Sequence, residues 1–377
     1  MIPAALALAP YRIPGHAAAT REEVDDNIAE LVAAEDEPTR ALPRIARFVA
    51  AFVARHEAQL TARGRDGRVR DGHGDLRAEH VVLEDGQVTI VDRLEFDPEL
   101  RRVDVADDLA FLVMDLRALG APAAAEQLID AYRSAGGDPG DDALVAFFAA
   151  HRALVRAKVA LLRAGQRTAD TERARDDESA AADLIRLAEH MTWAARGRRV
   201  VLVHGPPASG KTWLATALSA CSGLPVVSTD AVRKELLGVA ATEHAPPAAY
   251  APAQRRAVYA EVGRRAAAAL EHGSVIVDAT LGDPAVRGAL LEILAPEAAR
   301  LVAIRCHAER ATLLRRATDR AAHAADMSDA GRTEVEWLSE AFMPLTDIPA
   351  GQRIDVDTER DVEDLIDDVG SWIDQRP

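Results

Sequence analysis

"RVVLVHGPPASGKTWLATALSA", residues 199–220, decides the fold of the second half of the chain. Its first apolar run, VVLVH, is typical of a buried strand, and WLATALSA is typical of a helix. Between them Gly205, Gly210, Lys211 and Thr212 fit the pattern G-x-x-x-x-G-K-[ST] without a mismatch. In such a loop the backbone N–H groups and the helix N-terminus face phosphate oxygens, the lysine reaches the β- and γ-phosphates, and the hydroxyl coordinates Mg²⁺. The stretch therefore predicts a P-loop.

The P-loop implies ATP as the nucleotide and Mg²⁺ as its metal ion. A chance match in a glycine-rich turn is the alternative, but the strand and the helix on either side are the context that the motif requires. The residues expected to contact ATP are Gly205, Ser209, Gly210, Lys211, Thr212 and Trp213.

Apolar runs alternate with helical stretches on both sides of this loop. The runs are RVVLVH, LPVVSTD, SVIVDAT, RLVAIRC and RIDVD. This alternation predicts an α/β domain with a parallel sheet covered on both faces. The composition changes at "RGRRVVLVHG", so we expect a multi-domain chain with one domain over 1–195 and a P-loop domain over 196–377.

Polar residues follow two of the predicted strands, where open α/β sheets place their ligands. Asp278 ends SVIVDAT and is expected to hold the Mg²⁺ or a metal-bound water, although it could instead cap the next turn. Asp230 is expected to bind an acceptor hydroxyl or take its proton, and Arg233, one turn later, to bind a polar or anionic substrate group. The alternative is that Ser228, Thr229 or Asp230 is an N-cap of the helix AVRKELL.

A basic helix is predicted over "CHAERATLLRRATDRAAH". Arg316 and Arg320 are four residues apart and so lie on one face, where they are candidates to close over the triphosphate and neutralise charge in the transition state. A solvated face of arginines paired with acids is the other interpretation.

Residues 199 to about 372 resemble the AAA-type P-loop kinases that include gluconate kinases, polynucleotide 5′-kinases and zeta toxins. The similarity rests on GPPASGKT, STDAVRKEL, VIVDATLGDPAVR and RCHAERATLLRRATDR, in this order. It implies a five-stranded parallel sheet, an ATP·Mg²⁺ site, an acid near the acceptor hydroxyl and an arginine-bearing lid. Arg287, in DPAVRGALLEIL, is a further basic position that we assign to substrate binding.

The first half is predicted to be mainly helical, with a hairpin around Asp85-Gly86. Before the hairpin, "DGHGDLRAEH" at 71–80 resembles the catalytic half of aminoglycoside phosphotransferase-like kinases. The resemblance implies that Asp75 is the base and Asp92 a Mg²⁺ ligand, but His80 stands where the family has Asn.

Residues 1–70 contain no lysine and no strand-rich run, so the ATP-gripping lobe of such a kinase is missing from them. Three roles stay open for Asp75: a catalytic base, part of a substrate pocket or regulatory surface, and a structural remnant.

Composition limits the partners and the compartment. A net charge of −16 and an aromatic content of 4% argue against nucleic-acid binding. Two cysteines are too few for a disulfide framework, and the apolar N-terminal run is too short for a membrane span, so we expect a cytoplasmic protein without a membrane partner. The sequence gives no signal for the oligomeric state.

These observations together predict an ATP-dependent kinase that phosphorylates a hydroxyl of a small molecule such as a sugar or aminoglycoside. One alternative is a regulatory NTPase whose kinase-like half binds a partner. The other is a polynucleotide 5′-hydroxyl kinase, which needs only a short basic groove.

Overall fold

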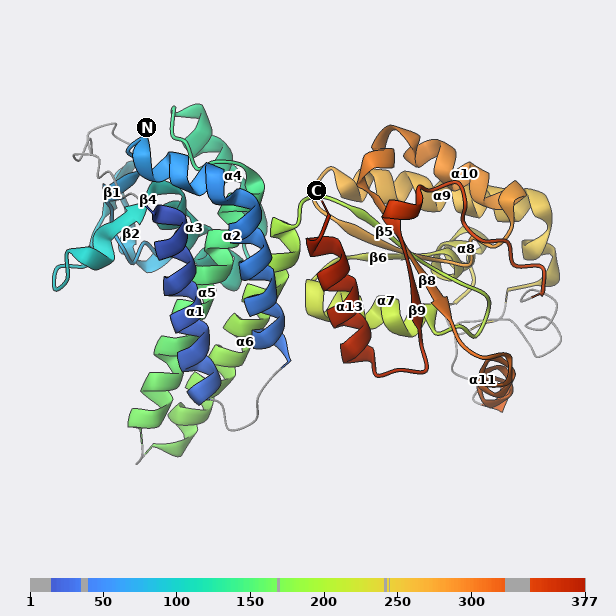
Figure 1. Cartoon of the computed structure of the whole chain (residues 1–377). Helices are drawn as coiled ribbons and strands as arrows, with labels where there is room; N and C mark the ends of the chain where they lie inside the picture. Colours follow the sequence, from blue (N-terminus) through green and yellow to red (C-terminus); the bar gives the residue numbers. More distant parts are fainter. Residues whose placement is uncertain are drawn as a thin grey trace. The chain divides into compact units, whose positions relative to one another are not determined.

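The computed structural model describes residues 15–34, 40–167, 170–240, 243, 245–322 and 340–376. The apolar N-terminal run and the Ser/Asp/Gly-rich stretch after 322 lie outside these ranges. The chain divides into two compact units, Met1–Arg196 with Asp374–Pro377 and Gly197–Ile373 (Figure 1). Within the described residues, no helix combines the length and the apolar character needed to cross a bilayer.

The first unit is built mainly from helices. Its α-helices are α1 (His16–Ala34), α2 (Ala41–Arg65), α3 (Val105–Ala118), α4 (Pro122–Ser134), α5 (Asp142–Gln166) and α6 (Thr171–Ala195), with 3₁₀ turns η1 (Ala78–His80) and η2 (Glu99–Arg101). Apolar side chains at three- and four-residue steps face one shared core. In this core the rings of Phe52 on α2 and Phe147 on α5 stack, with their centroids 4.4 Å apart.

Two short antiparallel pairs interrupt the helices of this unit. Strand β1 (Val69–Asp71) pairs with β4 (Arg102–Asp104), and β2 (Val81–Glu84) pairs with β3 (Gln87–Ile90). The second pair is the hairpin that the sequence predicts. Asp85 and Gly86 have φ values of 50° and 74°, as a two-residue turn with left-handed central residues requires.

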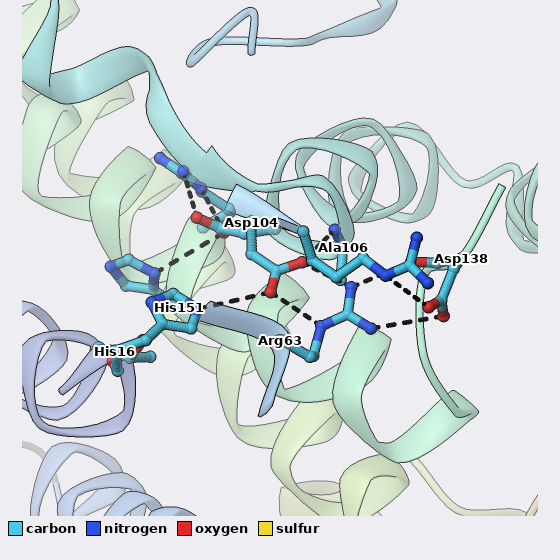
Figure 2. Close-up of polar contacts among 10 residues, drawn as sticks. His16, Arg63, Asp104, Ala106, Asp138 and His151 are labelled. Atoms are coloured by element: carbon cyan, nitrogen blue, oxygen red, sulfur yellow. Dashed lines mark hydrogen bonds and ion pairs between the residues drawn. The ribbon is translucent and has the colours of Figure 1, made fainter. Parts of the chain in front are cut away.

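An ion-pair cluster centred on the buried residues Arg63 and Asp104 joins α2 to the start of α3. Figure 2 shows Arg63 between the carboxylates of Asp104 and Asp138. The Arg63 Nη2 and Nε groups donate to Asp104 at 2.6 and 2.8 Å, and Asp104 also caps α3 by accepting the Ala106 N–H at 2.8 Å. Burial favours the neutral carboxyl, but hydrogen bonds from His16 and Arg63 lower the pKa of Asp104.

The second unit holds a five-stranded sheet in the order β6-β7-β5-β8-β9, with every pair parallel. The strands are β5 (Val200–His204), β6 (Val226–Ser228), β7 (Val275–Ala279), β8 (Leu301–His307) and β9 (Arg353–Asp357). They coincide with the five apolar runs of the sequence, so the predicted parallel sheet is confirmed.

Helices cover both faces of this sheet. They are α7 (Lys211–Ser222), α8 (Thr229–Leu237), α9 (Pro252–Leu270), α10 (Pro284–Leu294), α11 (Arg310–Ala322) and α13 (Val362–Asp374), with 3₁₀ turns η3 (Pro247–Tyr250), η4 (Ala295–Arg300) and η5 (Ala350–Gln352). In Figure 1, α9 and α10 lie on one face, and α7 and α13 lie on the other. Strands β5 and β7 are fully buried, so their carboxyl ends are fixed in position.

Candidate functional site

The P-loop runs from the end of β5 to the first turn of α7. Gly205 has φ +156°, and a Cβ there would lie 2.4 Å from the carbonyl oxygen of Cys306 in β8. Gly210 has φ +82°, and a Cβ placed on Gly210 would lie 3.0 Å from the Cβ of Thr358. Both glycines are therefore required by the backbone path. Gly210 is also the N-cap of α7 and offers no capping side chain, which suits a helix N-terminus that binds phosphate.

The motif threonine meets the carboxylate that ends β7. The Thr212 hydroxyl donates to Asp278 Oδ2 at 2.7 Å, because β5 and β7 are neighbours with Val203 opposite Asp278. Asp278 is 3% exposed, and among the described residues its Oδ1 has no hydrogen-bond partner. Burial raises the pKa of Asp278, and the positive charge of Lys211 opposes this rise.

These groups fit a magnesium ion. A hydroxyl and a carboxylate supply hard oxygen ligands, and one buried carboxylate oxygen lacks a partner among the described residues. Ser209 contributes a second such atom, since its hydroxyl oxygen is buried in the loop and also has no described partner. Trp213 is 46% exposed on the first turn of α7.

Asp230 and Arg233 form an ion pair on α8, directly after β6. Ser228 is the N-cap of this helix and accepts the Asp230 N–H at 3.3 Å, so the Asp230 carboxylate is not used as the cap. Ser228 lies opposite Asp278 in the sheet. Burial is the main cause of the raised pKa of Asp278, and the negative charge of Asp230 adds to it, which places the two carboxylates in electrostatic range.

Two tyrosines, which were not among the predicted site residues, lie near this pair. The Arg233 guanidinium lies over the Tyr250 ring, 4.7 Å from its centroid. The Tyr259 hydroxyl accepts the N–H of Leu281 at 3.3 Å, in the loop after β7. Burial raises the pKa of Tyr259, and charges of Arg255, Arg233 and Asp230 act on it. Nothing in the surrounding sequence marked these tyrosines as site residues.

Arg316 on α11 contacts the P-loop and the turn after β9. Its guanidinium donates to the Thr358 carbonyl oxygen at 2.7 Å, to Thr358 Oγ1 at 3.0 Å and to the Ala208 carbonyl oxygen at 3.4 Å. Arg316 thus lies beside the phosphate loop, as predicted for a charge-neutralising residue, but it is held by protein groups. The side chain of Arg320, the second predicted lid residue, lies outside the described part of α11.

Thr358 also contacts the P-loop, although it was not among the predicted site residues. Its hydroxyl donates to the Ser209 carbonyl oxygen at 2.8 Å, and its N–H donates to His307 at 2.9 Å. Thr358 is 2% exposed, and its hydrogen bond to Ser209 holds the backbone of the P-loop in place. The available signal was its place directly after the strand run RIDVD.

Arg287 is buried, and its guanidinium donates hydrogen bonds to three residues of the second unit. It donates to Asp347 at 2.7 Å and to the carbonyl oxygens of Leu281 and Met343 at 3.1 Å. These contacts fix the loop after β7 against the segment before β9. They give Arg287 a structural role, and its assignment to substrate binding stays a prediction that they do not favour.

The loop over residues 71–80 of the first unit is held by the Asp108 carboxylate on α3. The His73 and Gly74 N–H groups donate to the Asp108 carboxylate at 2.7 and 2.9 Å. Asp75 accepts from Arg77 Nε with both oxygens, at 3.1 and 3.2 Å. His80 Nε2 lies 3.3 Å from Asp92 Oδ2.

The resemblance implied that Asp92 binds Mg²⁺. Within the described ranges, no group of three or more His, Cys, Asp or Glu side chains could hold a metal ion. A metal role for Asp92 and a catalytic role for Asp75 stay predictions.

A family model described as an AAA domain matches residues 200–345. This range begins at β5 and contains both the P-loop and Asp278. A P-loop nucleotide-binding domain therefore occupies this part of the chain.

Curated relatives extend over much of the chain. An uncharacterized protein of Mycobacterium tuberculosis and one of Mycobacterium bovis are each 35% identical over 305 residues, which is 78% of this chain and 59% of theirs. The chain thus spans 59% of the length of these relatives.

Solved structures similar to the chain include two kinases. A gluconokinase from Sinorhizobium meliloti is 18% identical with a TM-score of 0.34, covering 47% of this chain and 92% of its own. A sugar kinase from a Janibacter species is 20% identical with a TM-score of 0.34, covering 47% and 95%. Scores this low carry no functional inference, so the assignment of the second unit rests on its sheet, its P-loop and the AAA-domain match.

Proposed function

We propose that the second unit transfers the γ-phosphoryl group of ATP to a hydroxyl of a small polyhydroxylated molecule. The observation that carries this proposal is the position of the Asp230–Arg233 pair, one strand away from the Thr212–Asp278 pair. A nucleotide switch needs only the Thr212–Asp278 pair. Phosphoryl transfer to a hydroxyl also needs a nearby carboxylate, and Asp230 can serve because it does not cap α8.

The donor side is provided by the P-loop. The N–H groups at the start of α7 bind the phosphates, and Lys211 neutralises charge on the β- and γ-phosphates. Thr212 and Asp278 would hold Mg²⁺, which supplies charge neutralisation and orients the phosphates. Arg316 lies at the carbonyl end of the loop and adds positive charge on the α11 side.

The acceptor side is provided by α8. The Asp230 carboxylate accepts the proton of the acceptor hydroxyl, and the hydroxyl oxygen forms a bond to the γ-phosphorus. The bond between that phosphorus and the β,γ-bridging oxygen breaks, and ADP leaves. Arg233 holds Asp230 in place and presents its remaining N–H groups to a polar group of the acceptor.

An ATP-consumption screen tests the proposal. The full chain with Mg²⁺ is assayed against sugars, aminoglycosides, nucleosides and 5′-hydroxyl oligonucleotides, beside Lys211→Ala. A small hydroxylated acceptor that raises turnover, with all turnover lost in Lys211→Ala, supports a small-molecule kinase. Turnover that no acceptor raises above a slow background removed by Lys211→Ala would instead indicate a regulatory NTPase, and labelling of the oligonucleotide a polynucleotide kinase.

A further inference from the structure

Exposed apolar side chains concentrate in one short stretch of the first unit. Of the 16 large apolar side chains that are exposed in the described part of the chain, seven lie between residues 82 and 100. Single exposed apolar residues are ordinary on protein surfaces, but a local concentration of them marks an interaction site. Four of the seven belong to the hairpin of β2 and β3, namely Val82, Leu83, Val88 and Ile90.

The pairing register gives this hairpin one apolar face. Val81 lies opposite Ile90, and Leu83 lies opposite Val88. Because side chains alternate along a strand, these four residues share one face, and neither strand places a polar residue on it. Leu83 is 76% exposed, so this face is open to solvent. The opposite face carries Val82, Glu84, Gln87 and Thr89.

The hairpin also has free edges. Within the described residues β2 and β3 pair only with one another, so no strand lies beside the outer edge of either. Proteins commonly protect such edges with proline or lysine, and neither strand contains one. A two-stranded sheet is only marginally stable by itself and gains from a third strand. An extended segment of another chain can therefore pair with an edge of this hairpin.

The charge around the hairpin selects the chemistry of the partner. Residues 78–100 contain seven acidic residues and one arginine, and this residue, Arg93, already pairs with Asp71. The side chain of Asp92, directly after the hairpin, is 80% exposed. Such a surface repels nucleic acids and anionic lipids. It also repels a second copy of itself, whereas it attracts a basic protein segment.

We propose that the β2–β3 hairpin binds a basic, extended segment of a partner protein, which pairs with it as a third strand. In this arrangement alternate apolar side chains of the segment extend the face formed by Leu83 and Val88. The lysine or arginine side chains between them extend the opposite face, which carries Glu84. The site belongs to the first unit and does not depend on the phosphoryl transfer proposed above.

Fluorescence anisotropy with the full chain and labelled peptides tests the site. The probe is a blocked seven-residue peptide in which lysine and valine alternate, as a third strand requires. The first comparison peptide has glutamate in place of lysine. The second is the probe methylated at every backbone nitrogen, which keeps the charges but cannot donate backbone hydrogen bonds. Only the probe is expected to bind, and added salt should weaken its binding.

Two substitutions and a matched control locate the binding surface. Leu83→Thr keeps a residue that favours strands but removes apolar area, and it should weaken probe binding roughly 10-fold. Glu84→Lys reverses a charge on the other face and should also weaken binding, most strongly at low salt. Leu162→Gln removes a leucine that is 55% exposed on α5 and should leave binding unchanged. All three should melt as the wild type does, because the substituted side chains are exposed.

The proposal is overturned if the probe does not bind, if either comparison peptide binds as tightly, or if Leu83→Thr binds the probe as the wild type does. Sedimentation over a range of chain concentrations tests a second copy as the occupant. A dimer that Leu83→Thr abolishes would assign the apolar face to self-association and would also overturn the proposal. None of these measurements uses ATP, so failure of the kinase proposal is detected separately.

Discussion

The hydroxyl of Thr212 donates a 2.7 Å hydrogen bond to the buried carboxylate of Asp278, 66 residues further along the chain. The P-loop and the end of β7 are thus joined in the folded chain itself. The contact keeps a hydroxyl and a carboxylate oxygen together, as the Mg²⁺ site proposed above requires.

Asp278→Asn is predicted to raise the melting temperature of the chain without ligands. The folded pKa of Asp278 lies above its ordinary value of 3.8, so the stability that its proton provides is present below that value and is lost as the pH rises through the folded pKa. At neutral pH the ionised carboxylate therefore costs stability. Each kcal/mol recovered corresponds to about 2–4 °C in a domain of this size.

The same variant should lose the stabilisation that ATP with Mg²⁺ gives to the wild type. Thermal melting at pH 7, with and without MgATP, measures both effects. An Asp278→Asn protein that melts as the wild type does and is still stabilised by MgATP would remove Asp278 from the metal site.

Gly205→Ala is predicted to destroy ATP binding. The new Cβ would stand 2.4 Å from the Cys306 carbonyl oxygen, so either β8 or the loop must move. Equilibrium binding of ATP and thermal melting should both show the damage. Gly273→Ala is the matched control, because nothing lies within 4 Å of a Cβ there; equal effects of the two variants would disprove the steric argument.

Asp230→Asn is predicted to reduce acceptor-stimulated ATP consumption by roughly 10²- to 10⁴-fold, the usual contribution of a positioned proton acceptor. Slow hydrolysis without acceptor should persist, because the P-loop is unchanged. Steady-state kinetics with the acceptor found in the screen measures the split. Glu235→Gln on the same helix, where Glu235 pairs with Arg265 at the surface, should leave both rates as in the wild type. Equal loss of both rates in Asp230→Asn would assign Asp230 to nucleotide binding.

Arg63→Met is predicted to cost about 3–5 kcal/mol of unfolding free energy, because it leaves the Asp104 carboxylate buried without its main partner. The folded pKa of Asp104 is lowered, so its stabilising contribution is present above 3.8 and is lost as the pH falls through the folded pKa. In Arg63→Met this acid loss should begin at a higher pH. Urea unfolding between pH 3 and 7 measures it.

Arg68→Met provides the comparison for this prediction. Arg68 pairs with Asp138 where both side chains are 42% exposed, and such pairs contribute about 0–1 kcal/mol. A cost for Arg63→Met no larger than that for Arg68→Met would show that burial of Asp104 does not matter.

The sheet and half of the candidate site could be predicted from the sequence. Strands of a parallel sheet are buried on both faces and so read as continuous apolar runs, which is why β5 and β7 were recognisable. Thr212 and Asp278 follow such strands directly, and the carboxyl ends of parallel strands meet at one edge. Their proximity can therefore be predicted from the sequence.

The contacts made across the fold could not be predicted in this way. Thr358 supports Ser209 from 149 residues away, and no local pattern encodes that pairing. Tyr250 ends the 3₁₀ turn η3 in a stretch rich in proline and alanine, and no local pattern encodes its contact with Arg233 on α8. Arg287 was assigned from its position alone, but its partner Asp347 lies 60 residues away and binds it within the protein.

Thr358 also makes the phosphate loop sensitive to a distant part of the chain. One side chain joins the carbonyl oxygens of Ser209 and His307 and receives Arg316, and the chain enters α13 within a few residues of it. We expect a shift in the position of α13 to move Thr358, and with it the backbone of the P-loop at Ser209. We therefore expect substitutions that shift α13 to change ATP affinity without altering any residue of the P-loop.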